Sequence, residues 1–276
     1  MVDQDIFPAD SEDSAMLAAY AEARRTFKFL WRELSWEYRR VVPGLDFAGI
    51  KLGFATGQTD ADAPPVEHMW VGDVQFDGET VSGTLLNDPD WIASMQSGDR
   101  VSAPLAELED WMYVIGGKVY GGYTVDVLRR GMTKSERQEH DTAWGMDFGQ
   151  PGQVQVVPLP RAKAGLLGGL LGSWGSSPAA STDDIAQQEH PMSENMGERM
   201  DEDLRNHPSV VHALDDDGWS LLQRDALAGN ATPVSLLLRH GADPAVRNPH
   251  GRSALDLAQQ MQWPNIVKLL QGAGAV

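Results

Sequence analysis

The sequence predicts an α+β protein: an N-terminal antiparallel sheet domain with a long amphipathic helix, followed by a short all-α array of repeats. Three observations support this prediction. Apolar residues recur at helical spacing near the N-terminus. Residues 66–123 alternate apolar and polar side chains around turn dipeptides. A residue pattern near the C-terminus then repeats at an offset of 33 residues.

The first predicted element is a helix over residues 14–42, which follows a tail, residues 1–13, expected to be disordered. Its apolar residues recur every three or four positions and form one stripe: Met16, Tyr20, Ala23, Phe27, Leu30, Leu34 and Tyr38. The dipeptide Pro43-Gly44 should end this helix. An amphipathic helix of this length predicts a partner surface on a sheet.

The next predicted elements are the strands of that sheet. A first strand is expected over Phe47–Ala55 and a second from Val66 onward, which Asp77-Gly78 turns into a hairpin with Thr80–Leu86. Asp88-Pro89 is typical of a helix start, so a short helix is expected over Asp90–Gln96, ending at Gly98. Two more strands are predicted near Arg100–Ala103 and Trp111–Ile115. Two helices are then predicted, one near Thr124–Arg130 and one from Thr133 to about Trp144.

Composition divides the chain into a domain over residues 14–149, a linker over 150–199 and a repeat array over 200–276. The linker prediction comes from its Gly, Pro and Ser content and from an acidic tract. The array begins with an expected capping helix over Met200–Ala213. Such a helix would cover the open end of two repeats, which are too few to be stable alone.

The array is predicted from two matching segments. Asp217-Gly218-Trp-Ser220 corresponds to His250-Gly251-Arg-Ser253, and each serine can cap the helix that follows it. The outer helix of the first unit should end at the turn Gly241-Ala-Asp243. This period and content resemble ankyrin repeats, and that resemblance implies a protein-binding scaffold.

A second resemblance covers residues 20–148. Asp110-Trp111 followed by Gly121-Gly122-Tyr123-Thr124, together with the segments around His68-Met-Trp70, Gly83-Thr-Leu85 and Gly98-Asp99, resembles the bacterial domain-of-unknown-function family 2314. No established activity comes with this family. The ending D-W…G-G-Y-T is also similar to an immunity-protein family of bacterial toxin systems. The structural interpretation of Asp110-Trp111 is a turn at a strand end with a packed indole.

Charge and composition narrow the class of function. The chain has 22 basic and 40 acidic residues and a net charge of −18, which argues against nucleic-acid binding because phosphate contacts need clustered Lys and Arg. There is no cysteine, and we expect a cytoplasmic protein without a membrane span. No nucleotide-binding or nucleophile motif occurs, and the scattered histidines predict neither a metal site nor a cofactor.

We therefore expect an immunity protein that neutralises a cognate toxin or secreted effector, for example of a type VI secretion system, by direct complex formation. Acidic side chains would steer a basic partner and aromatic ones would anchor it. The candidate contacts are Asp77, Glu79, Asp88, Asp90, Glu107, Glu109, Asp110, Trp219, Arg247, His250 and Arg252. One alternative is a regulatory scaffold for an endogenous bacterial protein. Another is a hydrolase that uses the Glu107–Asp110 carboxylates with His68 nearby.

Overall fold

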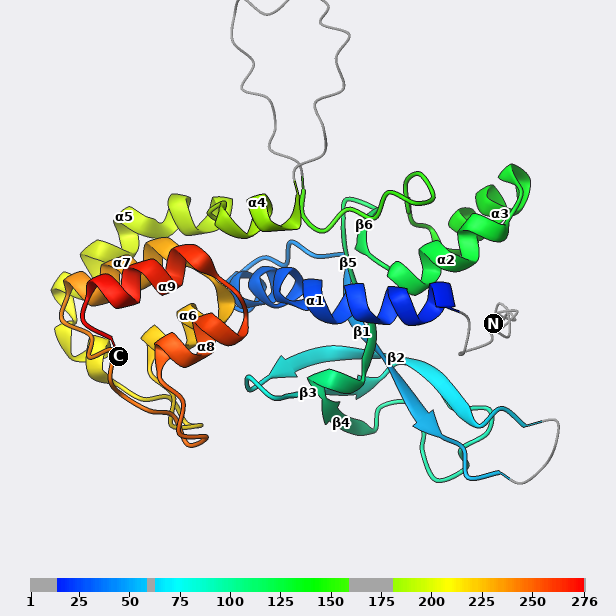
Figure 1. Cartoon of the computed structure of the whole chain (residues 1–276), viewed down its shortest axis with the longest axis horizontal. Coiled ribbons are helices and arrows are strands. Elements are labelled where there is room, and N and C mark those ends of the chain that lie inside the picture. Colours follow the sequence, from blue (N-terminus) through cyan, green and yellow to red (C-terminus); the bar gives the residue numbers. More distant parts are fainter. Residues whose placement is uncertain (1–13, 59–62, 159–180, 276) are drawn as a thin grey trace, which may run out of the picture. The chain divides into compact units, whose positions relative to one another are not determined.

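The computed structural model describes residues 14–58, 63–158 and 181–275, and it divides into two compact units (Figure 1). The N-terminal unit ends at Val156 and the C-terminal unit begins at Val157. The tail expected over residues 1–13 and part of the expected linker lie outside the described residues. No helix in the described ranges has the length and apolar character needed to cross a bilayer.

The N-terminal unit is built on one antiparallel sheet of six strands in the order β4-β3-β2-β1-β5-β6. The α+β class is therefore confirmed, and the hairpin at Asp77-Gly78 connects β2 to β3 as predicted. The strands are β1 (Phe47–Ala55), β2 (Val66–Phe76), β3 (Thr80–Leu85), β4 (Arg100–Pro104), β5 (Leu108–Ile115) and β6 (Lys118–Gly121). The helical segments are α1 (Ser14–Glu37), η1 (Leu105–Glu107), α2 (Tyr123–Gly131) and α3 (Lys134–Trp144).

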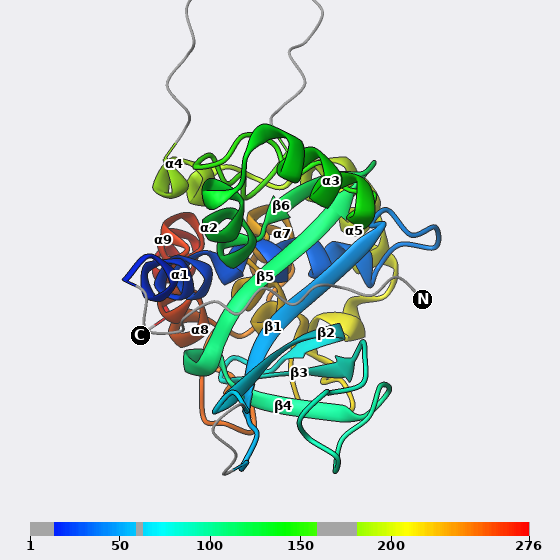
Figure 2. The same cartoon turned by 90° about the vertical axis from the view of Figure 1, so that its right-hand side faces the viewer.

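Helix α1 packs against strand β5, and Figure 2 shows β1 and β5 passing in front of it. The indole of Trp111 is fully buried in this contact and donates to the carbonyl of Ala23 at 2.9 Å. The same indole nitrogen lies 3.2 Å from the hydroxyl of Thr26. A buried indole N–H needs such a partner, so Trp111 fixes the position of α1 on the sheet.

The opposite face of the sheet carries a second, smaller core. Met112 and Val114 of β5 and Val119 of β6 are buried there. Partly buried side chains from the sheet and from the α3 end pack against them: Phe47, Trp70, Trp144, Met146 and Phe148. Both faces of β5 are therefore covered, and this strand is buried along nearly its whole length.

Two predictions about this unit were wrong. Helix α1 ends at Glu37 instead of Val42, and the carboxylate of Glu37 accepts the backbone N–H of Gly44 at 2.9 Å. Residues 90–96 form turns instead of a helix, and Glu67 accepts the backbone N–H groups of Asp90 and Trp91 at 2.6 and 3.0 Å. In both places a carboxylate binds backbone donors of an irregular loop.

The C-terminal unit is helical apart from one isolated β-bridge in the part that the structure describes. Its helices are α4 (Thr182–Gln187), α5 (Pro191–Asn206), η2 (Pro208–His212), α6 (Leu221–Ala228), α7 (Ala231–Arg239), α8 (Ala254–Gln260) and α9 (Pro264–Gly272). Helices α4 and α5 begin inside the stretch that composition assigned to a linker. The helix expected over Met200–Ala213 is thus the end of α5 followed by η2.

The two C-terminal segments that match in sequence also match in geometry. Asp215 accepts the backbone N–H groups of the second and fourth following residues at 3.1 and 2.9 Å. Asn248 makes the same two contacts at 3.1 and 2.9 Å. Ser220 and Ser253 then cap α6 and α8 with reciprocal capping boxes. The 33-residue repeat is therefore a structural repeat of turns and helix caps as well as a repeat in the sequence.

We predict that acid weakens the C-terminal unit partly through Asp256. The backbone N–H of Ser253 holds the pKa of this carboxyl below its ordinary value, with further help from Arg247. A carboxyl whose pKa is lower in the folded state stabilises the fold above its unfolded pKa, about 4. That stabilisation disappears as the pH falls through the folded pKa. Asp256→Asn should therefore flatten the loss of stability below about pH 4 in thermal unfolding of the full chain.

The matched control is Asp216→Asn. Asp216 is exposed and makes no hydrogen bond or ion pair within the described ranges. The acid dependence of this variant should equal that of the unchanged protein. An equal flattening in both variants would contradict the role assigned to the capping carboxylate.

Candidate functional site

The first candidate group is the carboxylate of Asp110, which the structure places inside the N-terminal unit with no exposed surface. Its Oδ1 accepts the N–H of Trp111 at 2.8 Å and that of Tyr123 at 3.0 Å. Its Oδ2 accepts the N–H and the hydroxyl of Thr124 at 2.7 and 2.6 Å. Asp110 thus satisfies the first backbone donors of α2, which begins directly after Gly122.

This arrangement corrects one interpretation of the sequence. The helix expected near Thr124–Arg130 is α2, and it takes its cap from a residue of β5. Asp110 was a candidate partner contact, but a side chain with no exposed surface cannot touch a partner of the folded protein. Burial raises the pKa of Asp110, while the hydrogen bonds from Thr124 and the charge of Lys51 act in the opposite direction.

The second candidate group joins Glu109 to His68. The Oε2 atom of Glu109 lies 2.6 Å from Nδ1 of His68, and the His68 side chain is 25% exposed. Glu109 is the extra residue where β5 bulges against β1, between the pairs Lys51–Asp110 and Leu52–Leu108. The bulge lets two consecutive carboxylates act differently: Asp110 caps a helix and Glu109 orients a histidine.

Lys51 of β1 lies close to these carboxylates, and the sequence did not single it out. It is opposite Asp110 on one side and Trp70 on the other. Burial lowers the pKa of its ammonium, against the opposing charges of Asp110 and Glu109. A signal was present in the sequence, since Lys51 stands mid-strand with glycine two positions away on both sides.

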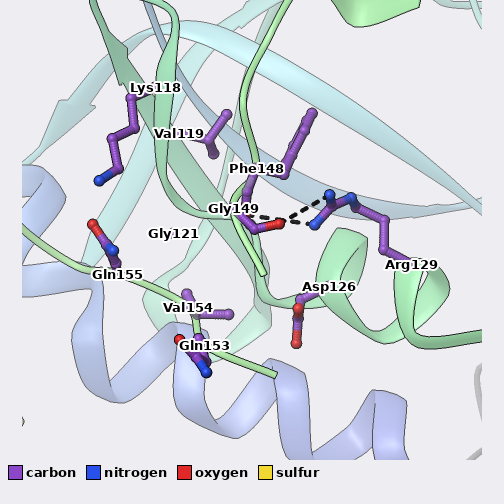
Figure 3. Close-up of a pocket in the computed structure, with 11 residues that line it drawn as sticks. Lys118, Val119, Gly121, Asp126, Arg129, Phe148, Gly149, Gln153, Val154 and Gln155 are labelled. Carbon is purple, nitrogen blue, oxygen red and sulfur yellow. Dashed lines mark hydrogen bonds between the residues drawn. The ribbon is translucent and has the colours of Figure 1, made fainter. Parts of the chain in front are cut away.

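A small cavity lies next to this region, between β6, α2 and the segment after α3 (Figure 3). Its volume is about 20 Å³, which holds roughly one water molecule. Arg129 lines it and is buried, bonded through two nitrogens to Asp141 and through one to the carbonyl of Gly149. An organic cofactor does not fit there. Within the described ranges no three His, Asp or Glu side chains converge as metal ligands would.

The other acidic candidates of the N-terminal unit lie at its surface. Asp88, Asp90, Glu79 and Glu107 are exposed, and Asp77 is half-buried. The carboxylate of Asp77 accepts the backbone N–H groups that follow the turn, at 2.9 and 2.7 Å. These residues come from the hairpin, the loop after β3 and η1, so the structure does not gather them into one cluster with Glu109 and Asp110.

The candidates of the C-terminal unit lie at the turns of the two repeats. Trp219 is buried under the guanidinium of Arg224, whose central carbon is 4.5 Å from the ring centroid, so its indole is not exposed as an anchor. Arg247 is exposed and bonds to the carbonyl of Gly251. The last two candidates, His250 and Arg252, are exposed and half-buried, respectively.

Comparison with known proteins gives matches to both parts of the chain. Residues 13–148 match a family described as an uncharacterized protein conserved in bacteria, DUF2314. A protein of Neisseria meningitidis serogroup B, provisionally named an ankyrin repeat protein, is 36% identical over 271 residues, which cover 98% of each chain. The uncharacterized protein YegJ of Escherichia coli is 34% identical over 86 residues, 31% of this chain and 56% of YegJ. An ankyrin repeat-containing protein of Treponema pallidum is 43% identical over 66 residues, 24% and 22% of the two chains.

We predict that Asp110 acts on stability. Asp110→Asn should lower the free energy of unfolding by about 2–4 kcal/mol, because the new amide group turns a donor toward backbone donors in a buried place. Thr124→Val should cost about 1–2 kcal/mol by removing one of the four bonds. Denaturant unfolding followed by tryptophan fluorescence measures both.

Glu107→Gln is the control, because this side chain is exposed and should change stability by less than about 0.5 kcal/mol. An Asp110→Asn protein that is as stable as the control would show that Asp110 is not the cap of α2.

Proposed function

This chain belongs to the family of the meningococcal protein named for ankyrin repeats, and we propose on that premise that it is an immunity protein. In this proposal it neutralises a bacterial toxin or secreted effector by direct complex formation. Ankyrin-named relatives indicate protein–protein interaction as the general function. That the protein partner is a toxin goes beyond what the names of these relatives indicate, and we propose it here.

The observation that carries the proposal is the repeated turn-and-cap geometry of the C-terminal unit. Two loops with the same hydrogen bonds, each followed by a capped helix, present equivalent turn positions 33 residues apart. Regular loops on a stacked helical frame are a surface that protein-binding repeats use. Arg247, with 57% of its side chain exposed, and His250 stand at the second of these loops.

Charge supports a cationic partner. The net charge is −18, and Asp88, Asp90 and Glu107 place carboxylates on the surface of the N-terminal unit. A surface of one sign raises the association rate with a partner of the opposite sign and makes that rate depend on salt. A basic nuclease or another cationic effector fits this surface better than nucleic acid or an anionic membrane does.

The regulatory scaffold shares this architecture and differs only in its partner. The hydrolase alternative has one supporting observation, the contact between Glu109 and His68. Asp110 is not available as a catalytic carboxylate for a hydrolase, because it already accepts four hydrogen bonds. A binding protein therefore accounts for more of the structure than a hydrolase does.

The test begins with the tagged full chain, purified from its own bacterium together with the products of adjacent genes. We expect a stoichiometric complex with a neighbouring protein that kills when it is produced alone, and survival when both are produced. A non-toxic partner would instead establish the scaffold.

The electrostatic part is tested with the triple variant Asp88→Asn, Asp90→Asn, Glu107→Gln. We expect association with that partner to slow by about tenfold at low salt, while the dissociation rate changes little. The matched control is Asp183→Asn, Glu194→Gln, Glu202→Gln in the C-terminal unit, where neutralised carboxylates lie outside the proposed set. Equal rates in both triple variants would overturn the role of the acidic loops.

A further inference from the structure

The starting observation is the setting of Lys51 in the middle of the sheet. Along β1, Gly49 and Gly53 are its neighbours on the same face, because side chains alternate along a strand. A methyl group at Gly49 would meet the ring of Phe47 at 2.8 Å, and one at Gly53 would meet the carboxylate of Glu109. The ring and the carboxylate therefore lie over the strand on either side of Lys51.

The cross-strand neighbours complete this enclosure. Trp70 is opposite Lys51 on β2, and Asp110 is opposite it on β5. The ring centroids of Trp70 and Phe47 are 6.4 Å apart in an edge-to-face contact. Lys51 therefore has an aromatic side chain opposite it on β2 and a carboxylate opposite it on β5.

The ammonium group has no dedicated partner. Within the described ranges Lys51 makes no hydrogen bond, and no carboxylate lies within ion-pair distance of it. Asp110 is already held by four donors and Glu109 by His68. Burial of the ammonium costs hydration, and in the described structure no ion pair offsets that cost.

We propose that Lys51 is a nucleophilic amine that forms a covalent imine with an aldehyde. Lys51 is half-buried, and the rings of Phe47 and Trp70 on its face of the sheet offer an apolar surface for the body of a small aldehyde. His68 is a diagonal neighbour of Lys51 across β1 and β2, and Glu109 orients its ring. The pair can take up the proton that the amine loses.

The chemistry balances without a further co-reactant. The amine lone pair attacks the carbonyl carbon, a C–N bond forms, and the π electrons of the C=O bond move to oxygen, which takes a proton. The nitrogen loses one proton to His68 or water. Loss of water then leaves the C=N bond of the imine.

The ionisable groups around the amine set its state at neutral pH. Asp110 and Glu109 face it from β5 and His68 from β2, while burial lowers the pKa of Lys51. Tyr20 of α1 lies beside the same two carboxylates, and burial with the charge of Glu109 raises its pKa to about 12, so it stays neutral. At pH 7 a larger fraction of Lys51 is therefore unprotonated than of an exposed lysine.

The test labels the intact full chain with a limiting amount of acetaldehyde and sodium cyanoborohydride, which reduces each imine to a stable secondary amine. Peptide mass spectrometry then gives the rate at every lysine. We expect Lys51 to react at least about tenfold faster than Lys134 and Lys268 at pH 7. Both of these lysines are exposed. The ratio of the labelling rate at Lys51 to the rates at Lys134 and Lys268 should fall toward pH 10, where exposed amines also lose their protons.

A rate at Lys51 equal to or below that of the exposed lysines at pH 7 would overturn the proposal. The unchanged protein is the one labelled, so the result does not depend on a variant that might fail to fold. His68→Gln tests the positioning role of the histidine. We expect a several-fold slower reaction at Lys51 with unchanged rates at Lys134 and Lys268, and an unchanged rate at Lys51 would exclude His68 from the step.

Discussion

The N-terminal unit depends on two adjacent residues of β5 that hold two helices, α1 and α2, which also pack against each other. Asp110 accepts the first backbone donors of α2, and Trp111 donates to a backbone carbonyl of α1. The ring of Tyr123, at the start of α2, also makes an edge-to-face contact with the Trp111 indole. The dipeptide Asp110-Trp111 therefore connects β5 to both α1 and α2, and its indole and carboxylate are both fully buried.

That connection also explains why sequence reasoning placed Asp110 at the surface. The partners of its carboxylate lie 13 and 14 residues later in the chain, at a helix start that no local pattern of β5 predicts. Glu67 is similar, since it binds the backbone of a loop 23 and 24 residues away, where a helix was expected. The burial of Trp219 was also not predicted from the sequence, because the Arg224 side chain that covers it is placed there by the fold.

Features with local causes were predicted well. The hairpin at Asp77-Gly78 follows from a turn that only two residues define, and the bounds of the first strand are those expected. The caps at Thr133, Ser220 and Ser253 depend on a partner three residues later, so the sequence contains both halves of each contact. The turns before α6 and α8 are predictable for the same reason, because each is closed within five residues.

Part of the acidic composition has a structural role, so net charge alone does not measure the charge that is free to meet a partner. Glu37, Glu67, Asp88 and Asp110 all accept backbone N–H groups, so part of the negative charge stabilises loops and a helix start. Such carboxylates cannot turn fully toward a partner without losing those bonds. In the proposed complex, steering of a basic partner would therefore depend most on exposed carboxylates that bind no backbone N–H, of which Glu107 is one.

Lys51 is the place where the local pattern and the packing disagree most. A strand at the centre of a sheet favours apolar or β-branched side chains, yet this position holds a lysine with a glycine two positions away on either side. The glycines weaken the strand, and burial of the ammonium costs solvation that no ion pair offsets in the described structure. Natural sequences break several rules at one position mainly where function requires it. The same glycines make room for an aromatic ring and a carboxylate beside the amine, so burial favours its neutral form while the carboxylate favours the charged one.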